Sequence, residues 1–237
     1  MKKIFFVLVA AIYSMSLNAQ IVQFMKGNTV VATYDASEVD NVVFEDETLA
    51  TTGTAKARRY GQDIDVKWVQ LWSDGPKFAE YNVGTYELKP ESESGLYCWG
   101  KTKDFDTKSE YYTGSSNLTG TDDTATAIWG SNWRMPTESE YEKLVQNCTS
   151  EWITINGVNG RLFTGKGDYA GNSVFFPAHG YKDTDNYYSN EAHDSGWYWA
   201  STRWNETLAI CMVFTEAKAQ TGARLKSYGM SVRAVLK

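Results

Sequence analysis

Four consecutive residues late in the chain, Arg203-Trp204-Asn205-Glu206, combine a cation, an aromatic ring, an amide and a carboxylate. Flat aromatic faces suit sugar rings or a protein epitope, and neighbouring amide and carboxylate oxygens suit hydroxyl groups or calcium. Tyr187 and Tyr188 stand in a second polar stretch, where no apolar periodicity requires an aromatic side chain. These six residues are predicted to bind a ligand, with a glycan as the preferred class and a surface protein as the alternative.

The stretch Gly160 to Gly167 (GRLFTGKG) comes within one residue of a phosphate-binding loop. Its last position is glycine instead of serine or threonine, so no hydroxyl group is available to hold Mg²⁺. A phosphate-binding loop also needs a strand before it and a helix after it, whereas an Asn-Gly turn precedes this stretch. We interpret it as a glycine turn between strands.

Other catalytic and metal-binding patterns are weak. His179 and His193 are the only histidines, and Glu191 and Asp194 beside His193 lack a second His or Cys at zinc-ligand spacing. No serine or cysteine stands in a Gly-x-Ser-x-Gly setting. The sequence therefore predicts a non-enzymatic protein with no metal site and no cofactor, calcium at Trp204-Asn205-Glu206 being the alternative considered.

The elements that must position these residues include two helices. Thr137 is an N-cap candidate with Glu140 three residues later, the two halves of a capping box. An apolar stripe at helical spacing then follows, formed by Tyr141, Leu144, Val145 and Cys148. A shorter helix is predicted to begin at Asp122 or Asp123 and to end at Gly130.

The remaining pattern is typical of strands and turns. Asn156-Gly157 between two apolar runs predicts a β-hairpin. Leu208 to Phe214 is predicted to be a central strand, and Trp197 and Trp199 are predicted to pack in the core. Polar stretches are predicted to be surface loops, and the ligand-contacting loops would be Lys182–Ser195, Ser201–Thr207 and Glu216–Ala223.

The N-terminus resembles an export signal. Lys2-Lys3 precedes an apolar run from Ile4 to Leu17, too short to span a bilayer, and Ala19 offers a cleavage point. We expect a signal peptide at residues 1–19, a small β module at 20–45, a linker at 46–57 and the main domain at 58–237. The mature chain is expected to be periplasmic, on the cell surface or extracellular, without membrane insertion.

Charge and cysteine content bear on nucleic-acid binding and on disulfide bonds. The net charge is −6 and lysine and arginine are scattered, so the basic patch of a nucleic-acid binder is absent from the sequence. Three cysteines, Cys98, Cys148 and Cys211, allow at most one disulfide. A Cys148–Cys211 bridge and three buried thiols both remain open.

Several motifs together resemble one family of exported Bacteroidetes proteins, the Fibrobacter succinogenes major paralogous domain family. The similarity runs in consistent order from about Lys67 to Val235, and the module at 20–45 is similar to the segment often found before such domains. The motifs that carry it are Asp122–Ala125, Trp129-Gly130, Trp133–Thr137 with Glu140, Leu144 and Cys148, Asn156–Gly160, Asn172–Tyr181, Gly196–Thr202, Arg224 and Gly229–Arg233.

The resemblance implies an α+β, C-type lectin-like fold related to that of formylglycine-generating enzymes. Two short helices would lie beside a twisted, mainly antiparallel sheet with long loops. It implies no activity, because the cysteines and the His-rich motif of the enzymatic relatives have no counterpart here. The calcium lectins pair a Glu-Pro-Asn loop with Trp-Asn-Asp, and only Trp204-Asn205-Glu206 is similar. The expected function is an exported binding module, and the alternative is a structural or assembly component of a surface or fimbrial apparatus.

Overall fold

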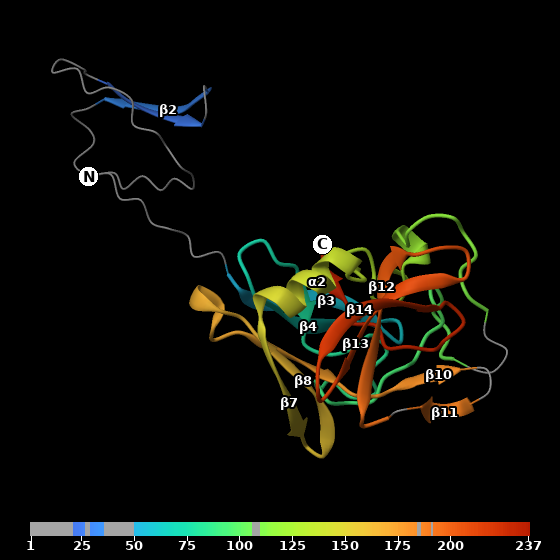
Figure 1. Ribbon diagram of the computed structural model, residues 1–237. Helices are drawn as coiled ribbons and strands as arrows, with labels where there is room; N and C mark the ends of the chain where they lie inside the picture. Colours follow the sequence, from blue (N-terminus) through green and yellow to red (C-terminus); the bar gives the residue numbers. More distant parts are fainter. Residues whose placement is uncertain (1–20, 27–28, 36–49, 106–109, 184–185, 191) are drawn as a thin grey trace. The chain divides into compact units, whose positions relative to one another are not determined.

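The computed structural model describes residues 21–26, 29–35, 50–105, 110–183, 186–190 and 192–237. The chain divides into two units, Met1–Leu49 and Ala50–Lys237. In the first unit, β1 (Ile21–Lys26) and β2 (Thr29–Asp35) form an antiparallel hairpin (Figure 1). The predicted signal peptide and residues 36–45 of the predicted β module lie outside the described residues.

The second unit is a mixed α/β domain whose sheets are mainly antiparallel. Its five-stranded sheet consists, in spatial order, of β3 (Thr52–Arg59), β4 (Gln62–Gln70), β5 (Lys77–Ala79), β15 (Val235–Leu236) and β6 (Trp133–Arg134). Strand β15 thus pairs between β5 and β6, so this sheet combines strands that are far apart in the sequence.

Strand β3 corrects the predicted linker at 46–57 for residues 52–57, whereas residues 46–49 lie outside the described residues. Residues 52–59 pair along their whole length with β4, from Thr52 opposite Val69 to Arg59 opposite Gln62. The inward positions are Gly53, Ala55 and Ala57. Their small side chains leave room for the indole of Trp68, because a Cβ on Gly53 would lie 2.7 Å from that ring. A strand with glycine and alanine on its inner face looks like a linker in the sequence because it lacks large apolar residues.

Three further sheets complete the domain. One joins β7 (Thr149–Ile155), β8 (Val158–Thr164) and β9 (Ser173–Pro177); another joins β12 (Ser195–Arg203), β13 (Leu208–Thr215) and β14 (Ala219–Leu225); the third is the pair β10 (Tyr181–Asp183) and β11 (Asn186–Asn190). The Asn156-Gly157 hairpin is confirmed, with φ of 49° and 84° at these two residues. The prediction that Leu208–Phe214 forms a central strand is also confirmed.

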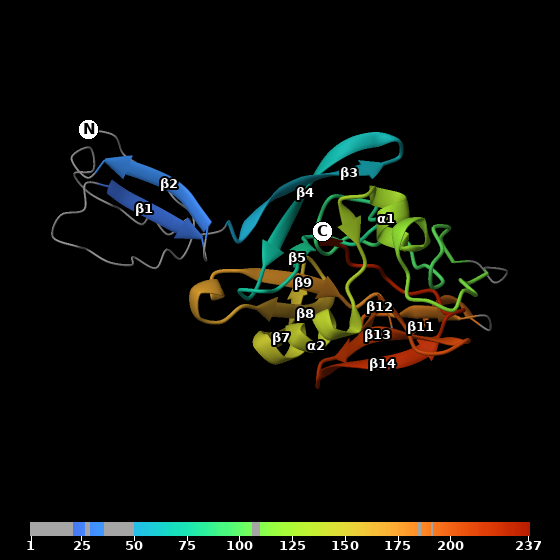
Figure 2. The same cartoon turned by 90° about the horizontal axis from the view of Figure 1, so that it is seen from above.

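Both predicted helices form. Asp123 caps α1 (Thr124–Trp129), accepting a hydrogen bond from the Thr126 N–H. Thr137 and Glu140 form the predicted capping box at the start of α2 (Glu138–Asn147). Helix α2 packs against the β12-β13-β14 sheet, whereas α1 lies against β3 and β6 (Figure 2). Among the described residues, no helix is both long enough and apolar enough to cross a membrane.

Several segments predicted to be loops are strands. Lys182–Ser195 contains the end of β10, all of β11 and the first residue of β12, and Glu216–Ala223 contains most of β14. Strand β14 is an edge strand with one neighbour, so it tolerates polar residues that a central strand would exclude. The predicted strand over Met230–Leu236 is regular only at Val235–Leu236, although all but the last residue is buried.

The core contains two aromatic clusters. One surrounds Trp99, Trp133 and Trp199, and the other surrounds Phe163, Phe176 and Phe214. The prediction that Trp197 and Trp199 belong to the core is confirmed. Between the sheets, the buried guanidinium of Arg233 donates hydrogen bonds to Ala79 O (2.9 Å) and Phe175 O (2.8 Å).

The three cysteines are free, buried thiols, so the Cys148–Cys211 disulfide considered above does not form. Cys148 follows α2 and packs in the phenylalanine-rich cluster, whereas Cys211 lies on β13 in the tryptophan-rich cluster. Burial raises the pKa of Cys148 to about 11 and that of Cys211 to about 12. The thiols therefore act as small apolar side chains.

Candidate functional site

Trp204 and Asn205 lie in the turn between β12 and β13. Trp204 is 60% exposed. The side-chain oxygen of Asn205 accepts hydrogen bonds from the backbone N–H groups of Thr207 (2.9 Å) and Leu208 (2.8 Å). Asn205 therefore shapes the turn, and its amide oxygen is already engaged there instead of pointing to a ligand.

A buried lysine, Lys226, forms a hydrogen bond with the backbone of the same turn. The ammonium group of Lys226 donates to Glu206 O (2.9 Å) and lies 4.6 Å from the centre of the Trp99 ring. Burial lowers the pKa of Lys226. The Arg203 N–H donates to the Asn117 side chain, which ties the end of β12 to the preceding surface segment. The Glu206 side chain is exposed.

The three predicted contact loops do not all lie together. Ser195 pairs with Thr215 and Arg203 pairs with Ala209, so the turns after Arg203 and after Thr215 lie at opposite ends of one sheet. Eight residues of extended strand separate these ends by about 26 Å. Tyr187 and Tyr188 belong to β11, of which the structure describes the backbone but not the side chains. One small ligand cannot contact both ends of this sheet.

The described structure gathers aromatic side chains at a different place, which we call the tyrosine pocket. It is a cavity of about 310 Å³ between the tip of the β3–β4 hairpin, the segments around Gly84 and Gly95, and α1. Its lining residues are Arg58, Arg59, Tyr60, Gly61, Ile64, Tyr81, Gly84, Thr85, Tyr86, Gly95, Tyr97, Thr102, Asp104, Ile128 and Trp129.

Two tyrosines on the rim of this pocket face solvent. Tyr60 is 82% exposed and Tyr86 is 56% exposed, and both belong to the few large apolar side chains that the described residues expose. The floor is formed by buried rings: Tyr81 packs edge-on against Trp129 with 5.9 Å between ring centres. Burial raises the pKa of Tyr81 to about 12, so this phenol remains neutral at physiological pH. The pocket is aromatic at floor and rim.

Tyr97 completes the floor and depends on two glycines. A Cβ on Gly84 would lie 2.0 Å from the Tyr97 hydroxyl oxygen, and one on Gly95 would lie 2.5 Å from it. Only glycine lets the backbone approach the ring this closely. The adjoining Asp104 is exposed, and its Oδ1 accepts hydrogen bonds from the N–H groups of Leu96 (2.8 Å) and Phe105 (3.0 Å). The carboxylate is therefore fixed in place beside the rings.

Arg59 positions both rim tyrosines. Its Nη2 donates to the carbonyl oxygens of Thr85 (3.0 Å) and Tyr86. Its guanidinium carbon lies 5.1 Å from the centre of the Tyr60 ring. One side chain on β3 thus stacks on the first tyrosine and holds the backbone of the second, 27 residues away.

The turn that carries Tyr60 is under conformational strain. Tyr60 and Gly61 connect β3 to β4 with φ of 50° and 80°, the left-handed pair that a type I′ turn requires. Asparagine or glycine favours the first position, and a bulky aromatic residue there is an outlier. The β7–β8 hairpin of the same domain has the same pair of positive φ angles and uses Asn156-Gly157. An exposed tyrosine at a strained turn position is therefore a candidate functional residue.

The sequence did not single out these residues. The signal that could have found them is Tyr60-Gly61 between two alternating strands, where Asn-Gly would be usual. That signal was hidden because β3 was interpreted as a linker.

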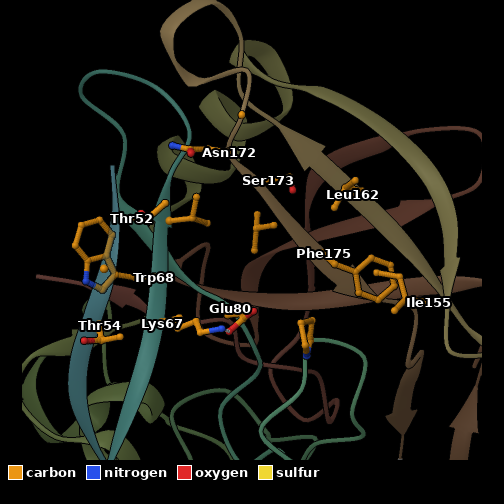
Figure 3. A pocket seen from close by; sticks show the side chains of 15 residues that line it. Thr52, Thr54, Lys67, Trp68, Glu80, Ile155, Leu162, Asn172, Ser173 and Phe175 are labelled. Atoms are coloured by element: carbon orange, nitrogen blue, oxygen red, sulfur yellow. Dashed lines mark ion pairs between the residues drawn. The ribbon is translucent and has the colours of Figure 1, made fainter. Parts of the chain in front are cut away.

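A second, wider cavity of about 540 Å³ lies between β3–β4 and the β7-β8-β9 sheet (Figure 3). Ile155, Leu162 and Phe175 form one wall, and Trp68, at its edge, points away past β3 (Figure 3). Lys67 and Glu80 point toward each other, with 3.8 Å between charged atoms. The groove thus offers apolar side chains and a compensated ion pair, without an exposed aromatic ring.

The histidines do not form a metal centre. Among the described residues, no group of three His, Cys, Asp or Glu side chains lies close enough to hold a metal ion. His179 is largely enclosed, and burial lowers its pKa to about 4, so its imidazole is neutral at physiological pH. Residues 160–164 of the stretch Gly160–Gly167 belong to strand β8, and only residues 165–167 form the turn into a short 3₁₀ helix (Gly167–Tyr169). The glycine-turn interpretation is therefore confirmed for residues 165–167 and wrong for residues 160–164.

Comparison with known proteins finds a family model that is similar to part of the chain. The model of a family described as a domain of unknown function (DUF8237) matches residues 149–235. This region runs from β7 into β15 and does not include the tyrosine pocket, whose lining residues all precede it. No curated protein and no solved structure matches the chain.

Proposed function

We propose that this protein is an exported, non-enzymatic binding module that recognises a glycan through the tyrosine pocket. The observation that carries this proposal is the pair of exposed rim tyrosines, Tyr60 and Tyr86, held by Arg59 around one cavity. Sugar rings present a flat apolar face and a hydroxylated edge. The tyrosines suit the face, and Asp104 and Arg58 suit hydroxyl groups at the edge.

The pocket supports binding better than catalysis. Sugar hydrolysis requires two carboxylates across the scissile bond, whereas the tyrosine pocket contains one, Asp104. Oligosaccharides incubated with the protein are therefore expected to be recovered intact, and released shorter sugars would contradict the non-enzymatic assignment. We further propose the C-type lectin-like fold and the major paralogous domain family for residues 50–237, with a periplasmic, cell-surface or extracellular location.

A glycan array with the full chain tests the proposal. Tyr60→Ala and Tyr86→Ala should each weaken binding about threefold to tenfold, the equivalent of about 0.5–1.5 kcal/mol for one aromatic contact. Trp204→Ala is the matched control, because Trp204 is also an exposed aromatic residue but lies on the β12–β13 turn. Loss of binding in Trp204→Ala alone would move the site to Arg203–Glu206, and a blank array would exclude glycans.

An assembly role is the second candidate. The hairpin β1–β2 consists of two strands, and a two-stranded sheet is only marginally stable by itself. Its strand edges could pair with another subunit. Deleting residues 21–49 removes this unit and leaves β3 intact, since β3 begins at Thr52. Loss of surface attachment with retained glycan binding would support the assembly role of this unit, and unchanged attachment would exclude it.

A further inference from the structure

A smaller cavity of about 160 Å³ adjoins the tyrosine pocket, and we call it the adjoining cavity. Tyr86 and Asp104 line both, so they form a shared wall. The other residues that line the adjoining cavity are Glu93, Ser94, Leu96, Ala178, His179, Lys182, Ala192 and His193.

Successive residues of the chain between the two cavities line the two cavities alternately. Gly95 and Tyr97 line the tyrosine pocket, whereas Ser94 and Leu96 line the adjoining cavity. The Tyr86 N–H donates to Glu93 O (2.9 Å), and Tyr97 forms a β-bridge with Asp104. The shared wall is therefore fixed by backbone hydrogen bonds, and the two cavities keep a constant separation.

The adjoining cavity differs chemically from the tyrosine pocket. Apart from the shared Tyr86 it contains no aromatic ring other than its histidines, and its polar side chains carry both signs: Glu93 and Asp104 against Lys182. Such a mixture of donors and acceptors matches hydroxyl groups, which both donate and accept, better than a ligand with a single charge.

We propose that the glycan is a neutral oligosaccharide that occupies both cavities. One sugar ring stacks on the rim tyrosines, and the next crosses the wall formed by Tyr86 and Asp104 and places its hydroxyl groups in the adjoining cavity. This inference rests on the proposed function and adds that ligand length matters, because a monosaccharide fills one cavity at a time.

Titration calorimetry with neutral glucose- and mannose-based oligosaccharides of one to six units tests this inference. Affinity is expected to rise at least about tenfold between one and three units and then to level off, because further units extend beyond both cavities. Glu93→Gln and His193→Asn should remove this gain and leave monosaccharide affinity unchanged. Asparagine is chosen at 193 because φ there is 72°, a value that asparagine tolerates.

The controls separate this inference from the proposed function. Tyr60→Ala should weaken every member of the series, whereas Trp204→Ala should leave the length dependence intact. Binding that depends on Tyr60 but not on length, or a length gain unaffected by Glu93→Gln and His193→Asn, overturns the two-cavity inference alone. If no member of the series binds while the array shows binding of other glycans, the two-cavity inference is overturned and the proposed function stands; a blank array as well overturns both.

Discussion

Replacing Tyr60 by asparagine should stabilise the domain and at the same time weaken ligand binding. Tyr60 has φ of 50° in a two-residue turn and is 82% exposed, so its ring gains little from burial. Asparagine adopts this left-handed conformation readily, and the domain already uses Asn156-Gly157 in its other turn of this kind.

The magnitude follows from two opposing terms. Relief of the left-handed strain is worth about 1–2 kcal/mol. Loss of the stacking between Arg59 and Tyr60, 5.1 Å apart, costs about 0.5–1 kcal/mol at an exposed site. The Tyr60→Asn protein should therefore be more stable by about 0.5–1 kcal/mol. For a domain of this size, that corresponds to a rise in Tm of roughly 1–4 °C.

Two matched variants isolate the strain. Tyr60→Ala removes the same ring but keeps a residue that disfavours positive φ, so the asparagine variant should exceed it by about 1 kcal/mol. Tyr60→Phe keeps both ring and strain and should match the parent protein. Urea and thermal unfolding give the stabilities, and glycan affinity is measured on the same samples. Both the Asn and Ala variants should lose affinity, and Phe should retain most of it.

The comparison between Tyr60→Asn and Tyr60→Ala tests whether the turn is strained at this residue. If Tyr60→Asn is no more stable than Tyr60→Ala, the turn stores no relievable strain at this residue. If the asparagine variant is more stable and binds as tightly as the parent protein, the strain has no role in recognition, and the reason given for a tyrosine at this position is wrong.

Three further results are expected. Burial alone would raise the pKa of Glu140, but hydrogen bonds from Arg134 and the Thr137 N–H hold this pKa below its ordinary value of 4.5. The ionised carboxylate therefore stabilises the fold fully above pH 4.5, and this stabilisation is lost as pH falls through the pKa of the folded state. Glu140→Gln should lower the free energy of unfolding in urea by about 1–3 kcal/mol at pH 7 and by clearly less at pH 3. A thiol reagent should label none of the three buried cysteines in the native protein and all three in denaturant, and rapid native labelling would contradict their burial. Arg233→Met should destabilise the domain by about 2–4 kcal/mol, because it leaves two buried carbonyl groups without donors, and an unchanged urea midpoint would show that these hydrogen bonds contribute little.

The sequence by itself determined the features that depend on neighbouring residues. The capping box of Thr137 and Glu140, a cap at Asp122 or Asp123 and the Asn156-Gly157 turn were all predicted because each needs only a few consecutive residues. The structure selects Asp123 as that cap. The central strand β13 was predicted because burial on both faces requires an uninterrupted apolar run. These signals are local, and tertiary contacts only reinforce them.

Only the tertiary structure decided which residues share a site. The tyrosine pocket joins residues from 58 to 129, and Arg59 reaches Tyr86 across 27 positions. The register of β12 with β13 moved the turn after Arg203 away from the turn after Thr215. The physical reason is that the lining of a cavity depends on strand pairing and chain crossings between distant segments. Strand β3, which carries Arg59, pairs with β4, and its small inward residues allow the Trp68 ring to pack closely against it. The pattern within β3 alone could not show this.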